Sequence, residues 1–556
     1  MTKKNNVKVL LVDPVPLSFS SPSIIKGNTL EPYACEVLAA ALDDLVENAI
    51  ETDTLGNIIE KNVKVLQSKG NNEFELAQAI IDEKPDIIGF SVRTCYYTRA
   101  THIASSIRKI IPDALIIFGG YHPSIDPENT LNNCNAIDIA IVGEGEETLC
   151  EIVNTYIEHK RNLENYKNIQ GAYVRDFSAY FQRRKRLSAE NWEVYAQKVI
   201  NHRKPKEAIA KCRNWNLSFP APSLQNGVAQ IQTQRGCPGD CSFCCTPNVW
   251  GDVKNTKSTD KQEYLNFRCG YVTQRKVENV VAEIKSIRDS FLKANQKPLN
   301  FFYFNDVTFN YYTKNGYYHL KALCNEMINS FGVLNETNQK IINDFKWFCL
   351  CRIPKSSKEA KDFIEILPLM AQAGCSKIGF GIESASNKIQ IQYNKMLEEN
   401  IIKAVLKASW ETGIINRAYL ILGAPEETEE TFNQTEEFLL NEDVFIDQIR
   451  VAFAVPFPGT KSAEEWIENI ITPHPSLDDY TEDIPIVKCP LGNKEDLINK
   501  RVSLIRNFYM NEKYEERVRE KVRRFPYLKQ SYEEFFVELC QISNFTIDHR
   551  KFNFNI

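Results

Sequence analysis

The sequence predicts an α/β protein with two successive parallel sheets and a mainly helical C-terminal region. Short apolar runs alternate with amphipathic stretches up to about residue 150, and again from residue 227. This βαβ rhythm is typical of parallel sheets that are covered by helices. A chain of 556 residues also exceeds what one hydrophobic core can hold. We therefore expect four segments, which are residues 1–160, 161–225, 226–470 and 471–556.

The first segment is expected to form a doubly wound sheet. Its strand candidates each end in a turn that contains glycine, serine or proline, and its helix candidates have helical periodicity. The strands are expected at 7–13, 85–91, 114–120 and 137–146, with helices at 30–45 and 99–111. Ligands of such sheets bind beyond the carboxyl ends of the strands. The residues that fall there are Ser91, Gly119, Gly120, His122, Gly143 and Glu144.

Residues 161–225 are polar, basic and irregular, so we expect a connecting segment, with the run Arg183–Arg186 as a solvated face or linker and not a binding patch. A second series of strands and helices then predicts a partial or full β/α barrel of the TIM type, whose chemistry collects at the carboxyl ends of the strands. Its strands are expected at 227–236, 300–306, 346–353, 377–384, 416–425 and 448–457.

Composition narrows the class of protein. The chain is 43% hydrophobic and 25% charged, as ordinary globular proteins are, and its net charge of −5 gives no general attraction for nucleic acid. The apolar run near the N-terminus ends at Asp13, which is too early for a signal peptide. No run approaches the roughly 18 apolar residues of a membrane span. We expect a cytoplasmic protein without a nucleic-acid partner.

Three of the 16 cysteines lie within ten residues, in "RGCPGDCSFC". Cys237, Cys241 and Cys244 directly follow the first expected barrel strand. Three thiolates could bind zinc together with a distant fourth ligand. They could also hold three corners of an iron–sulfur cubane and leave its fourth iron open for a ligand. Cys245 is a poor fourth ligand, because adjacent side chains point apart.

This C-x₃-C-x₂-C motif, with Phe243 before its last cysteine, resembles that of the radical S-adenosylmethionine (SAM) superfamily. Further stretches resemble later motifs of that family in order and spacing. They are "FNDVTFN", "AGCSKIGFGIESAS", "NK", "LILGAPEETEET" and "PFPGT". The resemblance implies a 4Fe–4S cluster on the three cysteines, whose free iron chelates SAM. Phe243 would then bind the cofactor, Glu383 and Ser384 would contact the nucleoside or methionine part of SAM, and Arg417 and Tyr419 would line the same mouth.

The first segment resembles the cobalamin-binding domain that precedes many radical SAM barrels. "SVRT", "GGYHPS" and "GEGEET" stand at the ends of its expected strands. The resemblance implies a Rossmann-like, flavodoxin-like domain that binds cobalamin near its small residues. The motif D-x-H-x-x-G is missing after the first strand, where the sequence reads "DPVPLSF", so no histidine is offered to cobalt there. A generic flavodoxin-like module is the alternative.

The resemblance implies a cobalamin-dependent C-methyltransferase that acts on an unactivated carbon of a peptide or natural product. An electron donor such as flavodoxin or ferredoxin would be its partner. Two alternatives use similar domains, namely a cyclase or rearrangement enzyme and a peptide epimerase, for which Cys375 would be the catalytic thiol. A non-catalytic cobalamin- or metal-binding regulator is the alternative of another class. The C-terminal region is expected to cap the barrel and select the substrate.

Overall fold

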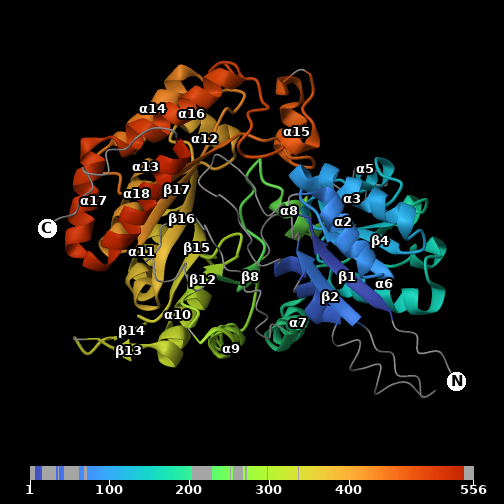
Figure 1. The fold of residues 1–556 in the computed structure, drawn as a ribbon. Coiled ribbons are helices and arrows are strands. Elements are labelled where there is room, and N and C mark those ends of the chain that lie inside the picture. Colours follow the sequence, from blue (N-terminus) through green and yellow to red (C-terminus); the bar gives the residue numbers. More distant parts are fainter. Residues whose placement is uncertain are drawn as a thin grey trace.

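Two six-stranded sheets lie side by side, each covered by helices (Figure 1). The computed structural model describes residues 7–14, 33–35, 37–42, 62–67, 72–202, 228–250, 252–253, 267–268 and 272–543, except for residues 297, 336 and 472. The sheet near the N-terminus is blue in Figure 1, and the second sheet is yellow.

The first sheet confirms the expected doubly wound α/β domain. Its strand order is β2-β1-β3-β4-β5-β6, in which the first five strands are parallel and β6 is antiparallel to β5. Buried aliphatic side chains fill both faces of the sheet, as expected when helices cover each side. The strands are β1 Lys8–Asp13, β2 Asn62–Gln67, β3 Ile87–Ser91, β4 Leu115–Gly119, β5 Ile139–Ile141 and β6 Ala172–Val174.

Two strands of this sheet were absent from the sequence prediction. The edge strand β2 has the mixed composition NVKVLQ, and β6 has only three residues. Because β6 pairs with β5, the first domain continues beyond residue 160 to at least Val174. Its helices are α2 Glu73–Asp82, α3 Tyr97–Ile110, α4 Tyr121–Ile125, α5 Pro127–Asn132 and α6 Glu146–His159, and α7 Ala189–His202 follows in the connecting segment.

The second sheet is a partial barrel. All six strands are parallel, in the order β18-β17-β16-β15-β12-β7. Since β7 and β18 stand at opposite ends of that order, the described strands form an open arc and no closed ring. The strands are β7 Ala229–Ile231, β12 Phe301–Phe304, β15 Lys346–Arg352, β16 Cys375–Glu383, β17 Ile415–Leu422 and β18 Gln448–Phe453.

Alternate residues of each strand face opposite sides of this arc. On β15, Trp347, Cys349 and Cys351 pack in the core between the sheet and its helices. Phe348 therefore faces the inside, where its ring stacks on that of Tyr303 with the centroids 5.3 Å apart. The covering helices are α9 Val277–Asn295, α10 Tyr318–Phe331, α11 Ser357–Gln372, α12 Asn387–Gln392, α13 Glu399–Glu411 and α14 Glu429–Leu440.

The C-terminal region covers the outer edge of the barrel, which differs from the expected cap. The Tyr509 hydroxyl accepts a hydrogen bond from the Ile449 backbone N–H on edge strand β18, at 2.9 Å. Buried Lys521 forms an ion pair with Asp447 at 2.7 Å. These contacts satisfy polar groups that an edge strand otherwise exposes. The helices are α16 Lys494–Tyr509, α17 Glu512–Arg524 and α18 Lys529–Ser543 (Figure 1).

Short elements connect the two domains. Helix α8, Thr246–Trp250, follows the cysteine motif and lies against α4 of the first domain (Figure 1). The 3₁₀ turn Leu477–Asp479, beyond α15 Lys461–Glu465, touches the turn Thr94–Tyr96 that follows β3. The minor strands are β8 Gln234–Arg235, β9 Asp252–Val253, β10 Phe267–Arg268, β11 Thr273–Gln274, β13 Val333–Leu334 and β14 Lys340–Ile341.

Candidate active site

The three motif cysteines lie on one tight loop after β7 and β8. A Cβ placed on Gly239 would stand 3.3 Å from the Cys237 sulfur and 3.8 Å from the Cys241 sulfur, so both sulfurs flank this glycine. The Gly239 N–H donates to the Cys237 sulfur at 3.3 Å, and the Cys244 N–H donates to the Cys241 carbonyl at 3.1 Å. The absence of a side chain at Gly239 thus leaves room for the Cys237 and Cys241 thiols beside it.

This donor set fits an iron–sulfur cluster better than a single ion. Among the described residues, no three His, Cys, Asp or Glu side chains are grouped as ligands of one metal ion. Two thiolates on one zinc ion stand only about 4 Å apart, because each Zn–S bond is about 2.3 Å long. The corners of a cubane are spaced more widely, which suits three thiols on a short loop.

Two cations lie beside the thiols. The Nε atom of Arg352, the last residue of β15, would be 3.8 Å from a Cβ on Gly239. Burial raises the pKa of the Cys241 thiol, whereas nearby Lys395 and Arg352 lower it. Positive neighbours stabilise thiolates and the negative charge of a thiolate-bound cluster.

Cys245 interacts with a residue of the first domain. Burial raises the pKa of its thiol to about 11, and the charge that opposes this shift is Arg93 of the first domain. Its interaction with Arg93 supports the expectation that Cys245 is no cluster ligand.

The motif "FND" positions the start of the cysteine loop. Asp306, directly after β12, accepts hydrogen bonds from the Thr233 N–H at 2.8 Å, the Thr233 hydroxyl at 2.5 Å and the Gln234 N–H at 3.0 Å. The carboxyl group is 1% exposed, and burial raises its pKa to about 7. Asp306 therefore replaces the missing backbone partners of the chain that leads into the loop.

Glu383 ends β16 in a strained conformation. Its φ is +66°, a value that residues other than glycine rarely adopt. Its carboxylate pairs with Lys395 at 2.9 Å. A Cβ on Gly381 would stand 2.6 Å from the Glu383 carboxylate oxygen, so only glycine leaves room for this pair. Strain of this kind is kept at functional sites when the surroundings enforce it. The pair lies close to Cys241.

Ser384 and Phe243 make packing and hydrogen-bond contacts in the chain around the site. The Ser384 hydroxyl is 3.0 Å from the Thr435 hydroxyl on α14 and accepts from the Ser386 N–H at 3.1 Å. Ser384 is 1% exposed. The Phe243 ring packs edge-on against Tyr393, with the centroids 5.2 Å apart. In the structure, both side chains fix the chain that surrounds the thiols.

Arg417 and Tyr419 face the inside of the barrel from β17. Tyr419 pairs in register with Gly381 and Arg450, and Arg417 pairs with Gly379 and Gln448 one layer deeper. A Cβ on Gly379 would stand 2.6 Å from the Tyr419 ring, so the ring lies across this glycine.

The ends of β3 and β4 form the wall contributed by the first domain. Ser91 and Gly119 are paired in register at those ends. Gly120 has a φ of +97°, and a Cβ there would lie 3.0 Å from the backbone N and O of Val92, so this turn requires glycine. At the next turn, Gly143 also has a positive φ, and a Cβ placed on it would lie 3.6 Å from the Val249 carbonyl oxygen of the barrel domain.

Arg93 connects the first domain to the cysteine loop. The arginine follows β3, and its side chain is exposed. It interacts with Cys245 of the cysteine loop and with Tyr303 of β12. Tyr121 at the end of β4 interacts with Cys244 and Cys245. We call the region where Arg93, Tyr121, the cysteine loop and β12 approach one another the interdomain chamber.

His122 and Glu144 do not face this chamber as the sequence predicted. His122 is 2% exposed, its Nδ1 lies 3.3 Å from the Thr94 hydroxyl, and burial lowers its pKa to about 4. It is a neutral core histidine beneath the turn. The Glu144 carboxylate contacts Arg235 at 3.0 Å and accepts from the Leu187 N–H at 2.6 Å. It joins the two domains instead of contacting a cofactor.

Arg235, directly before the cysteine loop, is the centre of that junction. Its guanidinium pairs with Glu144 at 3.0 Å and with Glu146 at 2.6 Å. It also lies between the rings of Trp192 and Trp250, 4.8 and 5.1 Å from their centroids. Burial lowers the pKa of Arg235, but the two carboxylates outweigh this and raise it. The junction thus fixes the cysteine loop against the first domain.

The basic run at Arg183–Arg186 belongs to the same junction and not to a solvated face. Arg186 donates to the Arg235 carbonyl at 3.2 Å, and Arg183 donates to the Val249 carbonyl at 3.4 Å. Arg184 pairs with Glu147 at 3.0 Å. These contacts join the connecting segment to both domains.

Cys375 lies at the wrong end of β16 for catalysis. It begins the strand that Glu383 ends, so eight residues at about 3.3 Å each place it roughly 26 Å away. It is 5% exposed and packs in the core between the sheet and its helices. This position argues against the predicted role of Cys375 as a catalytic thiol.

Four residues of this site were not singled out from the sequence. Arg352 was detectable as the last inward position of an expected strand, and Lys395 as part of the "NK" motif. Arg93 lies within "SVRT", and Arg235 directly precedes the first motif cysteine. No local pattern shows that these side chains meet, because they come from four separate segments.

Glu427, in the loop after β17, predicts a pH effect. It is 2% exposed, accepts from the Gly423 and Ala424 N–H groups, and burial raises its pKa to about 7. Because the folded-state pKa of Glu427 lies above its unfolded value, the contribution of this carboxyl group to stability is fully present below about pH 4.5 and is lost as the pH rises through 7. We expect Glu427→Gln to remove this loss, which is about 3 kcal/mol. Urea unfolding at pH 5 and 8.5 measures it, and a parallel pH dependence in both proteins would contradict it.

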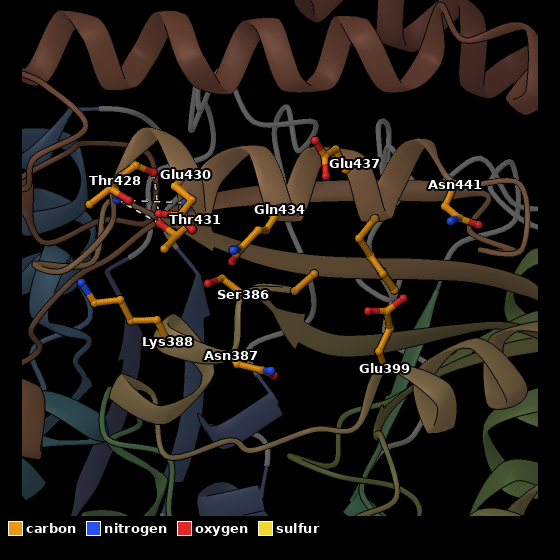
Figure 2. Close-up of a pocket in the computed structure, with 12 residues that line it drawn as sticks. Ser386, Asn387, Lys388, Glu399, Thr428, Glu430, Thr431, Gln434, Glu437 and Asn441 are labelled. Atoms are coloured by element: carbon orange, nitrogen blue, oxygen red, sulfur yellow. Dashed lines mark hydrogen bonds between the residues drawn. The ribbon is translucent and has the colours of Figure 1, made fainter.

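A pocket of about 580 Å³ lies apart from the cysteine loop, between α12 and α14 (Figure 2). Figure 2 shows Lys388 and Asn387 on one side, and Gln434 and Glu437 on the other. Its lining is mostly polar and holds none of the three motif cysteines. We assign it no part in the active site.

Two family models match the chain. The model described as "B12 binding domain" matches residues 27–153, and the one described as "Radical SAM superfamily" matches residues 231–439. Among the described residues, no helix is long and apolar enough to cross a membrane.

Curated relatives cover most of the chain at low identity. An uncharacterized methyltransferase of Pyrococcus horikoshii is 22% identical, and the match covers 91% of this chain and 93% of that protein. An anaerobic magnesium-protoporphyrin IX monomethyl ester cyclase of Rubrivivax gelatinosus is 23% identical over 80% of this chain and 69% of its own.

Solved structures share the arrangement of both domains. The radical SAM methyltransferase TsrM from Kitasatospora setae, with cobalamin and a 4Fe–4S cluster bound, has a TM-score of 0.58 at 19% identity, covering 90% of this chain and 85% of its own. The cobalamin-dependent SAM radical enzyme OxsB, with aqua-cobalamin and SAM bound, has a TM-score of 0.61 at 16% identity, covering 97% and 75%. At these identities the likeness shows the fold.

Proposed function

This chain is a member of the radical SAM superfamily with a B12-binding domain, and on that premise we propose that it is a cobalamin-dependent C-methyltransferase. Its substrate is a peptide or natural product with an unactivated carbon. The observation that carries the proposal is the interdomain chamber. Arg93 and Tyr121, at the ends of β3 and β4, reach the cysteine loop, so ligands of the two domains would face one space.

The residues of the chamber fit both cofactors. The turn at Gly119–Gly120 is closed by backbone contacts and leaves no side chain between the strand ends and the chamber. Cys237, Cys241 and Cys244 would hold the cluster, with Arg352 and Lys395 offsetting its negative charge. When bound, the cluster supplies the electron that cleaves SAM to a 5′-deoxyadenosyl radical, and cobalamin supplies the methyl group.

The remaining tasks fall to side chains of the chain. We assign Glu383 and Lys395 to positioning SAM, because their ion pair stands beside Cys241 at the strand end. Asp306 holds the cysteine loop in place through the Thr233 and Gln234 backbone. His122 is buried, and so it offers cobalt no ligand from this turn. A single-electron reductant such as flavodoxin or ferredoxin completes the proposed system.

The position of Cys375 weighs against peptide epimerisation. An epimerase needs a hydrogen donor on the face opposite the radical, and Cys375 lies roughly 26 Å along β16 from Glu383. Cyclisation is the second candidate, because the Rubrivivax relative is named a cyclase.

We expect two products from SAM when the reconstituted protein receives hydroxocobalamin and a strong reductant. Methyl transfer to the cofactor forms S-adenosylhomocysteine, in about one equivalent per bound cobalamin when substrate is absent, and radical cleavage forms 5′-deoxyadenosine. Mass spectrometry measures both.

Protein without cobalamin is the control, and it should form 5′-deoxyadenosine alone. If cobalamin binds but S-adenosylhomocysteine stays at the level of this control, methyl transfer is refuted and cyclisation becomes the leading function. If the corrinoid washes off completely, the first domain has lost its cofactor.

A further inference from the structure

Arg417 is a buried cation that hydrogen-bonds to Tyr419 and has no carboxylate partner in the part of the chain that the structure describes. It is 2% exposed on the inward face of β17. Its Nε and Nη2 atoms have no hydrogen-bond acceptor among the described residues, and no carboxylate there forms an ion pair with it. Burial lowers the pKa of its guanidinium.

Other buried arginines of this protein are paired with carboxylates, although Arg275 also has no acceptor at its Nε and Nη2 atoms. Arg235 contacts Glu144 and Glu146, Arg275 contacts Glu283 at 2.6 Å, and Arg501 contacts Asp483 at 3.2 Å. This is the general rule, because an unpaired buried charge loses its hydration without compensation. The exception at Arg417 therefore indicates a partner that arrives from outside the chain.

The unpartnered atoms define the chemistry of that partner. Nε and Nη2 lie on one edge of the guanidinium and present two parallel N–H donors, which match the two oxygens of a carboxylate or phosphate. The surroundings add no negative charge, since Arg417 interacts with Tyr419, Tyr509 and the cation Arg450. Arg450 is itself neutralised by Glu482 at 2.8 Å.

The position along β17 separates this site from the cysteine loop. Arg417 stands opposite Gly379, which has no side chain, and lies one inward layer deeper than Tyr419 and Arg450. Two residues of a strand span about 6.6 Å. A molecule held at this depth would extend from the barrel interior toward the chamber.

We propose that the Nε–Nη2 edge of Arg417 binds an oxyanion of the substrate, so that the substrate is an acid whose anionic end enters the barrel first. Its reacting carbon then lies toward the interdomain chamber. This inference rests on the proposed function, because it assigns the substrate to the barrel interior. It reassigns Arg417 from the SAM site to the substrate.

Thermal unfolding of the reconstituted enzyme tests the site with simple probes. Acetate represents a carboxylate and inorganic phosphate a phosphate, each compared with chloride at equal ionic strength. We expect at least one probe to raise the wild-type Tm by roughly 2 °C or more, because a ligand that binds only the folded state stabilises it. The probe with the larger effect identifies the kind of oxyanion. Arg417→Met should lose the effect.

Arg275→Met is the matched control. It removes an arginine that is paired with buried Glu283, and it should lower the Tm in chloride, whereas Arg417→Met should leave it equal or higher. Equal Tm losses in both variants, or no probe effect on the wild type, would overturn the proposal. So would a probe effect that vanishes when the enzyme is saturated with SAM, since Arg417 would then bind the cofactor.

Crystals of the wild type soaked in 4-bromobenzoate give a second measurement, which does not depend on a variant that folds. The expected result is anomalous bromine density beside the Arg417 edge, and its absence there counts against the site. S-adenosylhomocysteine formation tests the methyltransferase separately, so failure of one proposal can be told from failure of the other.

Discussion

Replacing Cys237, Cys241 and Cys244 together by alanine is expected to remove the iron–sulfur cluster completely. Reconstituted wild-type protein should hold about four irons per chain, and the variant none above background. The Cys237 and Cys241 sulfurs flank Gly239, with two cations beside them, and no other described group of three His, Cys, Asp or Glu side chains could hold a metal ion in their place. Formation of 5′-deoxyadenosine should fall to background, because the electron that cleaves SAM comes from the cluster.

Two single variants serve as controls for this loss. Cys245→Ala removes the thiol that interacts with Arg93, and Cys375→Ala removes the thiol at the far end of β16. Both should keep the iron content and the visible absorption of the wild type. Zinc in place of iron in the wild type, or iron retained by the triple variant, would rule out this assignment.

Arg235→Met is expected to destabilise the protein by about 3–5 kcal/mol, the usual effect of breaking a buried ion pair by removing one partner. The variant leaves Glu144 and Glu146 buried without their cation. Burial raises the pKa of Glu144, whereas Arg235 lowers it, so the variant should raise that pKa further. A raised folded-state pKa contributes stability at low pH that is lost as the pH rises. The loss of unfolding free energy in the variant should therefore be smaller at pH 5 than at pH 8.

Urea unfolding at both pH values measures this effect. The rescue variant adds Glu144→Gln and Glu146→Gln to Arg235→Met, and it should recover most of the stability because no charge remains buried. Lys461→Met, which breaks an exposed ion pair with Asp240, is the control and should change stability by less than about 1 kcal/mol. A deficit of that small size in Arg235→Met would show that the junction contributes little to stability.

The expected strands agree with the structure where apolar runs were continuous. Strands β15 and β16 lie within two residues of their expected bounds and β17 within three, because parallel strands are buried on both faces and their sequences are mostly apolar. Strands β2 and β6 were missed for the opposite reason. The first has mixed polarity at a sheet edge, and the second has three residues whose strand state depends on pairing with β5.

The residues of the candidate site likewise fall into those that could be predicted from the sequence and those that could not. Cys237, Cys241 and Cys244 could be predicted because their grouping depends on spacing within one loop. His122 and Glu144 stand at the predicted strand ends, yet the fold buries the first and pairs the second with Arg235. Strand ends determine where a residue lies along the sheet and leave open which neighbour it meets.

The sequence by itself indicated the fold class of the protein, the order of its two sheets and the three thiols proposed to bind the cluster. These properties depend on local periodicity and spacing, which a linear pattern records. Only the tertiary structure decided that Arg235 joins the domains, that Cys375 lies far from the thiols and that Arg417 has no carboxylate partner among the described residues. Each depends on packing between segments far apart in the chain, where burial makes the presence or absence of a counter-charge decisive.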